Sequence, residues 1–482
     1  MSEDAERKER SPGMKLLFVA LIGAVLTIPL LLIYALVYDR QNQSQTAQAA
    51  INAGWGGAQV IAGPVIVVPF RTTETQNEEI GGKSVTRTVE VEKLLYISPV
   101  ENTATTTINP QERTKSIYRS VLYEAKVSGK ANFALPDDLP RFGVTRERLL
   151  WDRAQLRMGV SDARGLTNGG TLSAGGKALA LQPGKGPAAT GGAGFFAFLP
   201  WNGEGVLAID YGFGLRGSRT LSLVPRGGQT SWEVSSSWQS PSFNGGFLPE
   251  KTAISSKGFK ASYIVDKLAL GQAPVMMEDP EPPMIDYANG YAGDSKIGME
   301  AASANDPSLG GAMEIVGGAS RALSIDLVEP VNLYSKVERA VKYGFLFIGF
   351  TFLAFFLFDI VGGARVAAAE YLLTGAGLIL FFALLLAFAE VIGFMPAYLL
   401  ASASIIGLLA SYSAAVLKSW MRGRFIGALL VGLYALLFVL LNLEAWSLLI
   451  GSVLLFAALA GVMYATRKVD WGAVGRREVA TN

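Results

Sequence analysis

The sequence predicts a mixed membrane protein, in which a β-rich, sandwich-like domain is joined to six transmembrane α-helices, one N-terminal and five C-terminal. Half of the 482 residues are hydrophobic and 17% are charged. The apolar residues are concentrated in one early segment and in the last third of the chain, as in membrane-spanning helices. Between these regions apolar and polar residues alternate, which is the pattern of strands with one buried face.

These composition shifts divide the chain into five expected parts. Residues 1–15 form a cytoplasmic N-terminus and residues 16–38 a transmembrane anchor helix. Residues 39–342 form the β-rich periplasmic domain. Residues 343–466 form a five-helix transmembrane bundle, and residues 467–482 a cytoplasmic basic tail.

The first span is expected over Leu16–Tyr38, a run without charged residues. A helix needs roughly 20 apolar residues to cross a hydrocarbon core of about 30 Å. A cleaved secretory signal is the competing interpretation, because basic residues precede the run and AQA occurs at Ala47–Ala49. The run is longer than a typical signal core and AQA lies well beyond its end, so an uncleaved anchor is favoured. Pro29 is expected to be tolerated, with a kink.

The segment after the anchor begins with DRQNQSQTAQAAINA, which is typical of a polar helical stalk. Strand alternation follows in SVLYEAKVSGKANFAL, in LAIDYGFGLRGSRTLSLV and in TSWEVSSSW, separated by turn residues. Two stretches of this segment resemble each other. VSGKANFALP and LRGSRTLSLVP are each followed by a strand that begins with Trp. The resemblance indicates either an internal duplication or chance similarity between strands. The Gly-rich stretch Gly165–Gly194 would then connect the two halves.

Five further spans are expected in the last third of the chain. They are Tyr343–Phe358, extending as far as Val361, then Tyr371–Ala389, Ile392–Leu417, Phe425–Leu443 and Ala445–Thr466. Their connections are too short for folded domains, so neighbouring helices are expected to run antiparallel.

Lys and Arg near short loops predict the orientation, because cytoplasmic loops carry an excess of them. These residues form three clusters. One precedes the first span, one lies between the fourth and fifth spans, and one follows the sixth. In that order they are Arg7, Lys8, Arg10 and Lys15; Lys418, Arg422 and Arg424; and Arg467, Lys468, Arg476 and Arg477. Six spans place all three clusters on one side. Both termini are therefore expected in the cytoplasm and residues 39–342 outside it.

Two features of the spans favour packing over transport. Ala403, Gly407, Ser411 and Ala415 recur every four residues, and such a stripe permits close helix contact within the bundle. The acidic residues of the spans lie at their expected ends rather than midway, whereas an ion pathway usually places charge inside; they are Asp359, Glu370, Glu390 and Glu444.

Lys336, Arg339 and Lys342 precede the second span on one arc of a helix, opposite Val337 and its apolar neighbours. The segment is therefore predicted to be an amphipathic entry into the membrane. Simple snorkelling of the long side chains to the interface is one explanation. The other is a coupling collar, in which these residues and Glu329 tie the β-rich domain to the membrane surface.

The composition excludes several kinds of chemistry. The chain has no cysteine and no histidine, which removes disulfides, thiol nucleophiles, His-based triads and zinc sites that need imidazole. GGTLSAGGKALA lacks the spacing of a phosphate loop. Carboxylates such as Asp152, Asp162 and Asp210 are expected at surface positions, and Trp232, Trp238 and Phe243 in the core rather than in a ligand groove. We expect no catalytic residue, cofactor or metal.

With these segments in place, nearly the whole chain resembles the CreD family of bacterial inner-membrane proteins, also called the cell-envelope integrity family. The resemblance rests on SDARGL at Ser161–Leu166, LRGS at Leu215–Ser218, SSSWQSPSFNGGFLP at Ser235–Pro249 and DLVEPVNLYSKVERAVKYGFLFIGFTFLAFFLFDI. It implies an inner-membrane location, a link to envelope stress, and no established enzymatic reaction.

Three functions remain open from the sequence. The first is a non-enzymatic envelope-integrity protein whose outer domain binds a periplasmic partner, lipid or envelope polymer. The second is a transporter or lipid-handling protein that uses the helix bundle. The third is a glycan hydrolase, which would need two carboxylates about 5–10 Å apart in a cleft. No nucleic-acid partner is expected, because the net charge is only +2.

Overall fold

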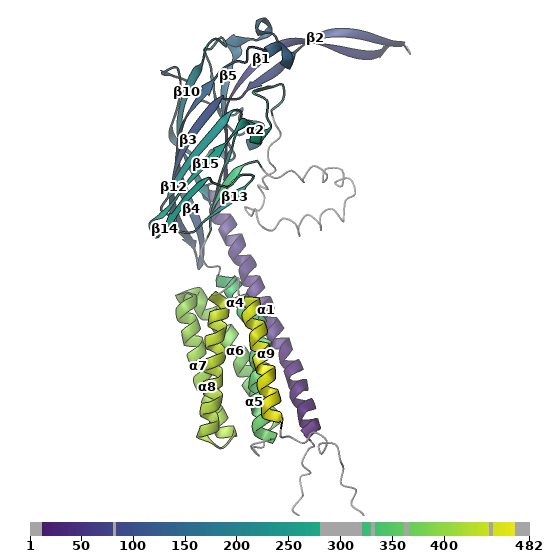
Figure 1. Cartoon of the computed structure of the whole chain (residues 1–482), viewed down its shortest axis with the longest axis vertical. Helices are drawn as coiled ribbons and strands as arrows, with labels where there is room; N and C mark the ends of the chain where they lie inside the picture. The colour runs from purple at the N-terminus through teal and green to yellow at the C-terminus, as the bar shows by residue number, and fades with distance from the viewer. Residues whose placement is uncertain are drawn as a thin grey trace, which may run out of the picture. The chain divides into compact units, whose positions relative to one another are not determined.

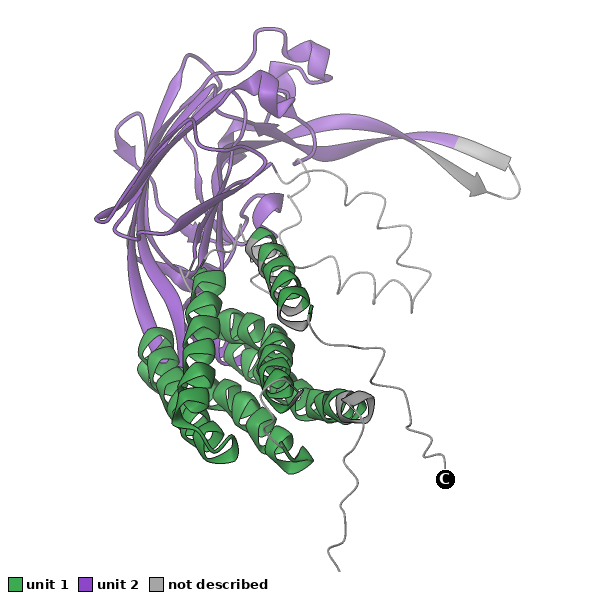
Figure 2. Ribbon diagram, turned by 60° about the horizontal axis from the view of Figure 1, so that its bottom comes forward, with its two compact units in different colours: residues 1–45, 331–482 green, residues 46–330 purple. Residues whose placement is uncertain are grey.

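A computed structural model describes residues 12–80, 83–279, 321–328, 333–360, 366–442 and 447–467. The chain forms two compact units (Figure 2). One unit contains residues 1–45 and 331–482 and is helical, and the other contains residues 46–330 and is rich in strands. This is the fold class that the sequence predicts.

Unit 2 is built from two sheets, which Figure 1 shows as layers of long strands. The strands are β1 Gln59–Ile80, β2 Lys83–Ile97, β3 Glu101–Lys115, β4 Tyr118–Phe133, β5 Gln155–Val160, β6 Leu166–Ala174, β7 Lys177–Ala178, β8 Gln182–Pro183, β9 Gly194–Phe198, β10 Leu207–Ser218, β11 Thr220–Val224, β12 Gln229–Ser236, β13 Pro241–Gly245, β14 Lys251–Ser255, β15 Gly258–Val265, β16 Val275–Met276 and β17 Leu323–Leu327. Short helices join them, namely η1 Leu139–Phe142, η2 Arg146–Arg148, η3 Trp151–Arg153, η4 Ala163–Gly165, η5 Ala188–Thr190 and α2 Lys267–Leu270.

Among the described strands, one sheet has nine strands and the other eight. The first has the order β13-β17-β11-β1-β5-β9-β8, with β2 beside β1 and β16 beside β2. The second has the order β14-β15-β12-β3-β4-β10-β6-β7. The chain passes between the sheets repeatedly, so neither sheet is a simple meander.

The inner faces of the two sheets form one hydrophobic core. Residues alternate between buried and exposed along β3, as a strand with one buried face requires. The first sheet contributes residues such as Ile66 and Leu156 to this core, and the second contributes Val127 and Trp232. Within it the Trp232 indole donates to the Thr106 hydroxyl at 2.9 Å, which pairs the polar group of the largest buried side chain. The domain is therefore a β-sandwich.

The strand order contains a repeat. The first sheet includes the run β17-β11-β1-β5 and the second the run β15-β12-β3-β4. In both runs the two central strands are parallel and the flanking pairs antiparallel. The strands β1, β3, β4 and β5 therefore correspond, in that order, to β11, β12, β15 and β17. In each set of four, the first strand lies in the first sheet, the next two lie in the second sheet, and the last returns to the first sheet.

This repeat differs from the sequence similarity noted above. VSGKANFALP lies on β4, whereas LRGSRTLSLVP lies on β10 and β11, and these strands are not equivalent in the repeat. The Gly-rich stretch is not a plain connector either, because it contains β6, β7, β8 and η5. Gly175 and Gly176 both have positive φ and form the tight turn between β6 and β7, where the phosphate-loop-like letters occur.

Strands β1 and β2 continue beyond the sandwich as a two-stranded ribbon, which projects from the domain in Figure 1. Their register runs from Ile66↔Ile97 to Ile80↔Lys83. Beyond the bridge between Phe70 and Leu149, the described part of β1 pairs only with β2. We call residues 71–80 and 83–94 the ribbon.

Unit 1 contains the membrane-spanning helices. They and one short helix are α1 Pro12–Trp55, α4 Leu333–Lys342, α5 Gly344–Ile360, α6 Ala368–Ile392, α7 Phe394–Val416, α8 Trp420–Asn442 and α9 Ser447–Thr466. Each C-terminal span expected from the sequence has a helix within five residues of its expected bounds, and the first expected span lies within the longer α1. Helix α1 continues past the apolar run to Trp55, so the polar stalk is helical, as its composition indicates.

Two expectations need adjustment. Five helices of the described chain are long and apolar enough to cross a membrane, and the expected count is six. The sixth segment is helical as α9, but its described residues qualify only as the shorter apolar stretch Gly451–Gly461. In addition, the β-rich unit ends at Pro330, so α4 belongs to the helical unit rather than to the β-rich segment that was expected to reach residue 342.

Candidate functional site

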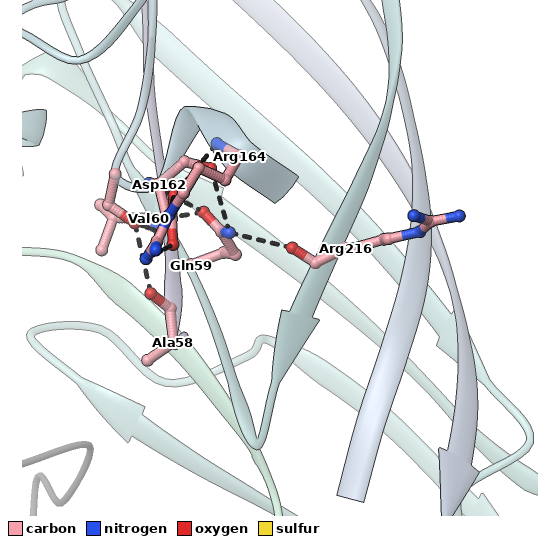
Figure 3. A network of polar contacts seen from close by, with 7 residues as sticks. Ala58, Gln59, Val60, Asp162, Arg164 and Arg216 are labelled. Atoms are coloured by element: carbon pink, nitrogen blue, oxygen red, sulfur yellow. Dashed lines mark hydrogen bonds and ion pairs between the residues drawn. The ribbon is translucent and has the colours of Figure 1, made fainter. Parts of the chain in front are cut away.

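Two of the segments that carry the family resemblance meet at one side chain, Gln59, at the start of β1 (Figure 3). The buried Gln59 amide nitrogen donates to the carbonyl oxygens of Asp162, at 3.3 Å, and Arg216, at 2.9 Å. Its amide oxygen accepts from the Asp162 amide and the Ser161 hydroxyl, both at 3.2 Å. The side chain thus uses both donors and its acceptor, which a buried amide requires.

Glycines allow these segments to approach Gln59. A Cβ on Gly165 would lie 2.4 Å from the Arg216 carbonyl oxygen and 2.6 Å from Gln59 Nε2. A Cβ on Gly217 would lie 2.4 Å from the Tyr123 hydroxyl and 2.7 Å from Gln59 Cγ. We call Gln59, Ser161, Asp162, Gly165, Arg216 and Gly217 the Gln59 clasp.

Charged groups at the clasp are paired. Arg164 contacts both carboxylate oxygens of Asp162, at 2.9 and 2.8 Å, and this hydrogen bonding lowers the pKa of the Asp162 carboxyl. The Arg216 guanidinium lies 4.6 Å from the Trp55 ring centre and donates to Glu124 at 3.2 Å. The Arg216 contact joins the end of α1 to the eight-stranded sheet. The clasp is a structural junction, and its polar atoms are occupied by each other.

The third resembling segment lies around β13, at one edge of the first sheet. Asp326 on β17 accepts from the Asn244 amide at 2.7 Å and from the Thr220 hydroxyl at 2.6 Å. The Trp238 indole donates to the Val328 carbonyl at 3.0 Å. Gly245 has a φ of 101°, and a Cβ there would meet the Ala322 carbonyl oxygen at 2.1 Å. This segment also serves to close the sandwich.

A buried ion pair between Arg226 and Asp279 escaped the sequence reasoning. Arg226 is 1% exposed and Asp279 also accepts the Ala188 amide at 2.5 Å. Desolvation lowers the pKa of the neighbouring Arg157, which Asp279 partly offsets. No local pattern marks Arg226, because it follows β11 in a Pro- and Gly-containing turn where periodicity gives no burial signal.

The carboxylates considered for acid–base chemistry are not brought together. Asp162 pairs with Arg164, and Asp210 on β10 lies 3.6 Å from its cross-strand neighbour Lys130 on β4. Asp152 lies in η3, and none of the ion pairs or hydrogen bonds found in the described residues joins two of these three. Within the described ranges, no cluster of three or more acidic residues could hold a metal ion. Trp232 is fully buried and stacks on Tyr263 at 5.3 Å, as a core residue does.

In the helical unit, α4 is amphipathic, because its basic residues Lys336, Arg339 and Lys342 are not buried, whereas its apolar face is. Val337, Ala340 and Val341 are buried, together with Tyr334. The Lys342 ammonium lies 2.8 Å from a Glu338 carboxylate oxygen. Glu329, the fourth residue of the expected collar, lies outside the described residues.

Lys336 and Arg339 bind the C-terminal end of α8. The Lys336 ammonium donates to Asn442 Oδ1 at 3.2 Å and lies 5.2 Å from the Phe394 ring centre. Arg339 donates to the Leu441 carbonyl at 3.3 Å. The last carbonyls of a helix lack partners within it and carry partial negative charge, so cations there are stabilising. Two of the three residues thus cap a neighbouring helix of the bundle.

The small-residue stripe on α7 does not make the expected bundle contact. Ala403, Gly407, Ser411 and Ala415 are exposed, and a Cβ on Gly407 would meet no atom within 4 Å.

A different face of α7 packs on α8. A Cβ on Gly423 would lie 2.6 Å from the Ala414 Cβ, and one on Gly427 would lie 3.2 Å from the Ala410 Cβ. The close contact therefore uses small residues one position away from the expected stripe, on the face that also buries Tyr398 and Ile405.

Comparisons with known proteins agree with this architecture. The sequence profile of the family described as "Inner membrane protein CreD" matches residues 11–472. The curated "Inner membrane protein CreD" of Escherichia coli (strain K12) is 30% identical over 460 residues, covering 94% of this chain and 92% of that protein. With its apolar helices, the chain is thus a multi-pass protein of the inner membrane in contact with the lipid bilayer. It belongs to the CreD family.

Proposed function

We propose that the protein is a non-enzymatic envelope-integrity protein whose β-rich unit lies in the periplasm and binds an envelope partner, while its helices anchor that unit in the inner membrane. The three basic clusters support this orientation, because cytoplasmic flanks of membrane helices are rich in Lys and Arg. The polar atoms of the Gln59 clasp are occupied by each other, and the carboxylates considered for acid–base chemistry are not joined in pairs, which favours a binding role over a catalytic one.

The observation that carries the proposal is the ribbon. An isolated two-stranded ribbon is at best marginally stable in water. Thr86, Arg87, Thr88 and Glu90 are exposed, and β1 and β2 each have an outer edge without a neighbouring described strand along the ribbon. An extended segment of a partner protein can add to such an edge through main-chain hydrogen bonds. The ribbon is therefore the proposed binding surface.

The bundle supports an anchoring role. The Asp, Glu, Lys and Arg residues of α5, α6 and α8 lie near the helix ends, as Asp359, Glu370, Glu390 and Arg422 show, and the described part of α7 contains none of these four types. A proton or ion pathway usually brings charge to mid-depth.

Shortening the ribbon tests the proposal. Arg71 pairs with Glu92, so Thr72–Val91 can be replaced by Asn-Gly, which favours a tight turn at that register. The removed residues lie outside the hydrophobic core, so the β-rich unit is expected to fold. Tolerance of envelope stress should fall to that of cells lacking the protein.

A matched control changes the β6–β7 turn, with Gly175→Asn leaving Gly176 in place. This variant should behave as the parent. A photo-crosslinking residue at Thr88 should capture a periplasmic protein, whereas one at Lys177 should not. A shortened ribbon that folds, reaches the membrane and fully preserves stress tolerance would contradict the proposal.

A further inference from the structure

An open apolar groove of about 320 Å³ lies between α1 and α5 in the helical unit. Gly23, Thr27 and Leu30 line it on α1, and Phe345, Gly349 and Phe352 on α5. Thr27, Phe345 and Gly349 are exposed, so the groove opens toward the surroundings of the helices, which in the membrane are lipid.

Two glycines hollow the groove. A Cβ on Gly23 or on Gly349 would meet no atom within 4 Å. The Thr27 hydroxyl donates to the Gly23 carbonyl at 3.2 Å, which satisfies it within α1. On another side of α1, Leu26 packs so closely on α6 that a Cβ on Gly375 would lie 2.1 Å from its Cδ1. That contact holds α1 in place beside the groove.

A pair of opposite charges lies one helical turn beyond the groove. Tyr34 follows Leu30 by four residues, and Lys342 precedes Phe345 by three. Glu338 Oε1 accepts from Lys342 at 2.8 Å and from the Tyr34 hydroxyl at 3.1 Å. The Lys342 side chain is 57% exposed, so its ammonium can donate to a second partner.

The same end of the unit contains a second balanced pair. Arg40 lies 3.9 Å from Glu390, which also accepts from the Tyr334 hydroxyl at 3.2 Å. Each pair joins one cation to one anion. A headgroup that carries both charges would match this arrangement, whereas a purely anionic headgroup would face two carboxylates as well as two cations.

We propose that this groove and the Lys342–Glu338 pair form a binding site for one phosphatidylethanolamine molecule. An acyl chain lies against Gly23 and Gly349, the phosphate contacts the Lys342 ammonium, and the primary ammonium donates to Glu338. Charge-assisted hydrogen bonds of this kind are stronger than neutral ones. The site does not depend on the ribbon or on the proposed envelope role.

Lipid chemistry distinguishes the proposal from general contact with the bilayer. Phosphatidylglycerol has the phosphate but no ammonium, and phosphatidylcholine has a quaternary ammonium that cannot donate a hydrogen bond. The full chain is purified in mild detergent, incubated with each lipid in turn and measured by native mass spectrometry. One phosphatidylethanolamine should remain per chain, with the other two lipids retained at about a tenth of that level, which corresponds to roughly 1.4 kcal/mol.

Three variants test the site residues. Gly349→Leu fills the groove and should lower phosphatidylethanolamine retention about tenfold, the loss expected when about two methylene groups are displaced. Glu338→Gln should remove the preference between lipids, because the primary ammonium then loses its anionic partner. Gly407→Leu is the matched control, because Gly407 is also a helical glycine with open space around its Cβ, and retention should be unchanged.

Gly23→Leu fills the groove from α1 and decides the result if Gly349→Leu does not fold. Equal retention of the three lipids by the parent would overturn the proposal. Parental retention in the folded groove-filling variant would also overturn it. A third contradicting result would be a parent protein that is a dimer and a groove-filling variant that is a monomer. In that case a second copy of the chain would occupy the groove.

Discussion

Gln59 and the glycines around it show how single residues join distant parts of the β-rich unit. SDARGL and LRGS stand out in the sequence, but their meeting point could not be predicted, because hydrogen bonds between segments far apart in the chain leave no local pattern. Gly165 illustrates this. Its sequence context resembles a turn, and only the structure shows the Arg216 carbonyl oxygen 2.4 Å from where a Cβ would be.

Gly165→Ala should therefore destabilise the β-rich unit. The added methyl group meets a backbone carbonyl that cannot rotate away, and overpacking of this kind costs about 1–3 kcal/mol. Thermal unfolding of the purified protein, followed by the circular dichroism of the β-strands, measures the loss of stability. Gly57→Ala is the control, since a Cβ there meets nothing within 4 Å. Equal melting temperatures for the two variants would show that the clasp can relax around a side chain.

At the level of elements, the sequence was most informative where periodicity was strong. The C-terminal apolar spans were predicted within five residues and α4 was predicted to be amphipathic, because length and a polar arc identify such helices. The buried face of α7 was not. A helix that is apolar all round has no polar face to indicate its orientation, and small residues occur on two of its faces. Strand order was equally out of reach, because pairing between distant strands depends on the whole fold.

The α7–α8 contact gives a prediction that separates those two faces. Gly423→Leu should destabilise the bundle, because its Cβ would lie 2.6 Å from the Ala414 Cβ, with an expected cost of about 1–3 kcal/mol. Gly407→Leu, on the exposed stripe, should leave stability unchanged. Thermal unfolding in detergent compares them. A larger loss from Gly407→Leu would restore the stripe as the packing face.

Helix α4 gives a second prediction at this scale. Replacing Lys336, Arg339 and Lys342 together by Gln removes the cations at the end of α8 and the partner of Glu338. Hydrogen bonds of charged groups contribute about 1–3 kcal/mol, less where they are exposed, so the bundle should melt at a lower temperature while insertion persists. Faster amide exchange in α4 should accompany the change. Arg424→Gln, an exposed change at the other end of α8, is the control, and equal melting of the two proteins would limit the basic residues to snorkelling.

For the whole molecule, two units of different chemistry follow directly from composition. The alternating segment forms two sheets with edge strands, whose backbone groups would be unsatisfied in lipid, and long apolar runs have no reason to remain in water. What composition left unsettled is how many helices cross. Helix α9 decides on which side residues 467–482 lie, and the described part of it is shorter than the other spans.

Single cysteines settle both orientation and count, because the chain has none of its own and each introduced thiol is the only one present. Lys177→Cys lies in the exposed β7, Met421→Cys at the start of α8, and Ala480→Cys near the C-terminus. A maleimide that cannot cross the inner membrane should label Lys177→Cys in intact spheroplasts. It should label the other two only after the membrane is opened, because Lys418, Arg422 and Arg424 favour the cytoplasm around Met421.

Labelling of Ala480→Cys in intact spheroplasts, with Met421→Cys protected, would mean that α9 does not cross. The reverse pattern for Lys177→Cys and Met421→Cys would place the β-rich unit in the cytoplasm and remove the basis for a periplasmic partner at the ribbon.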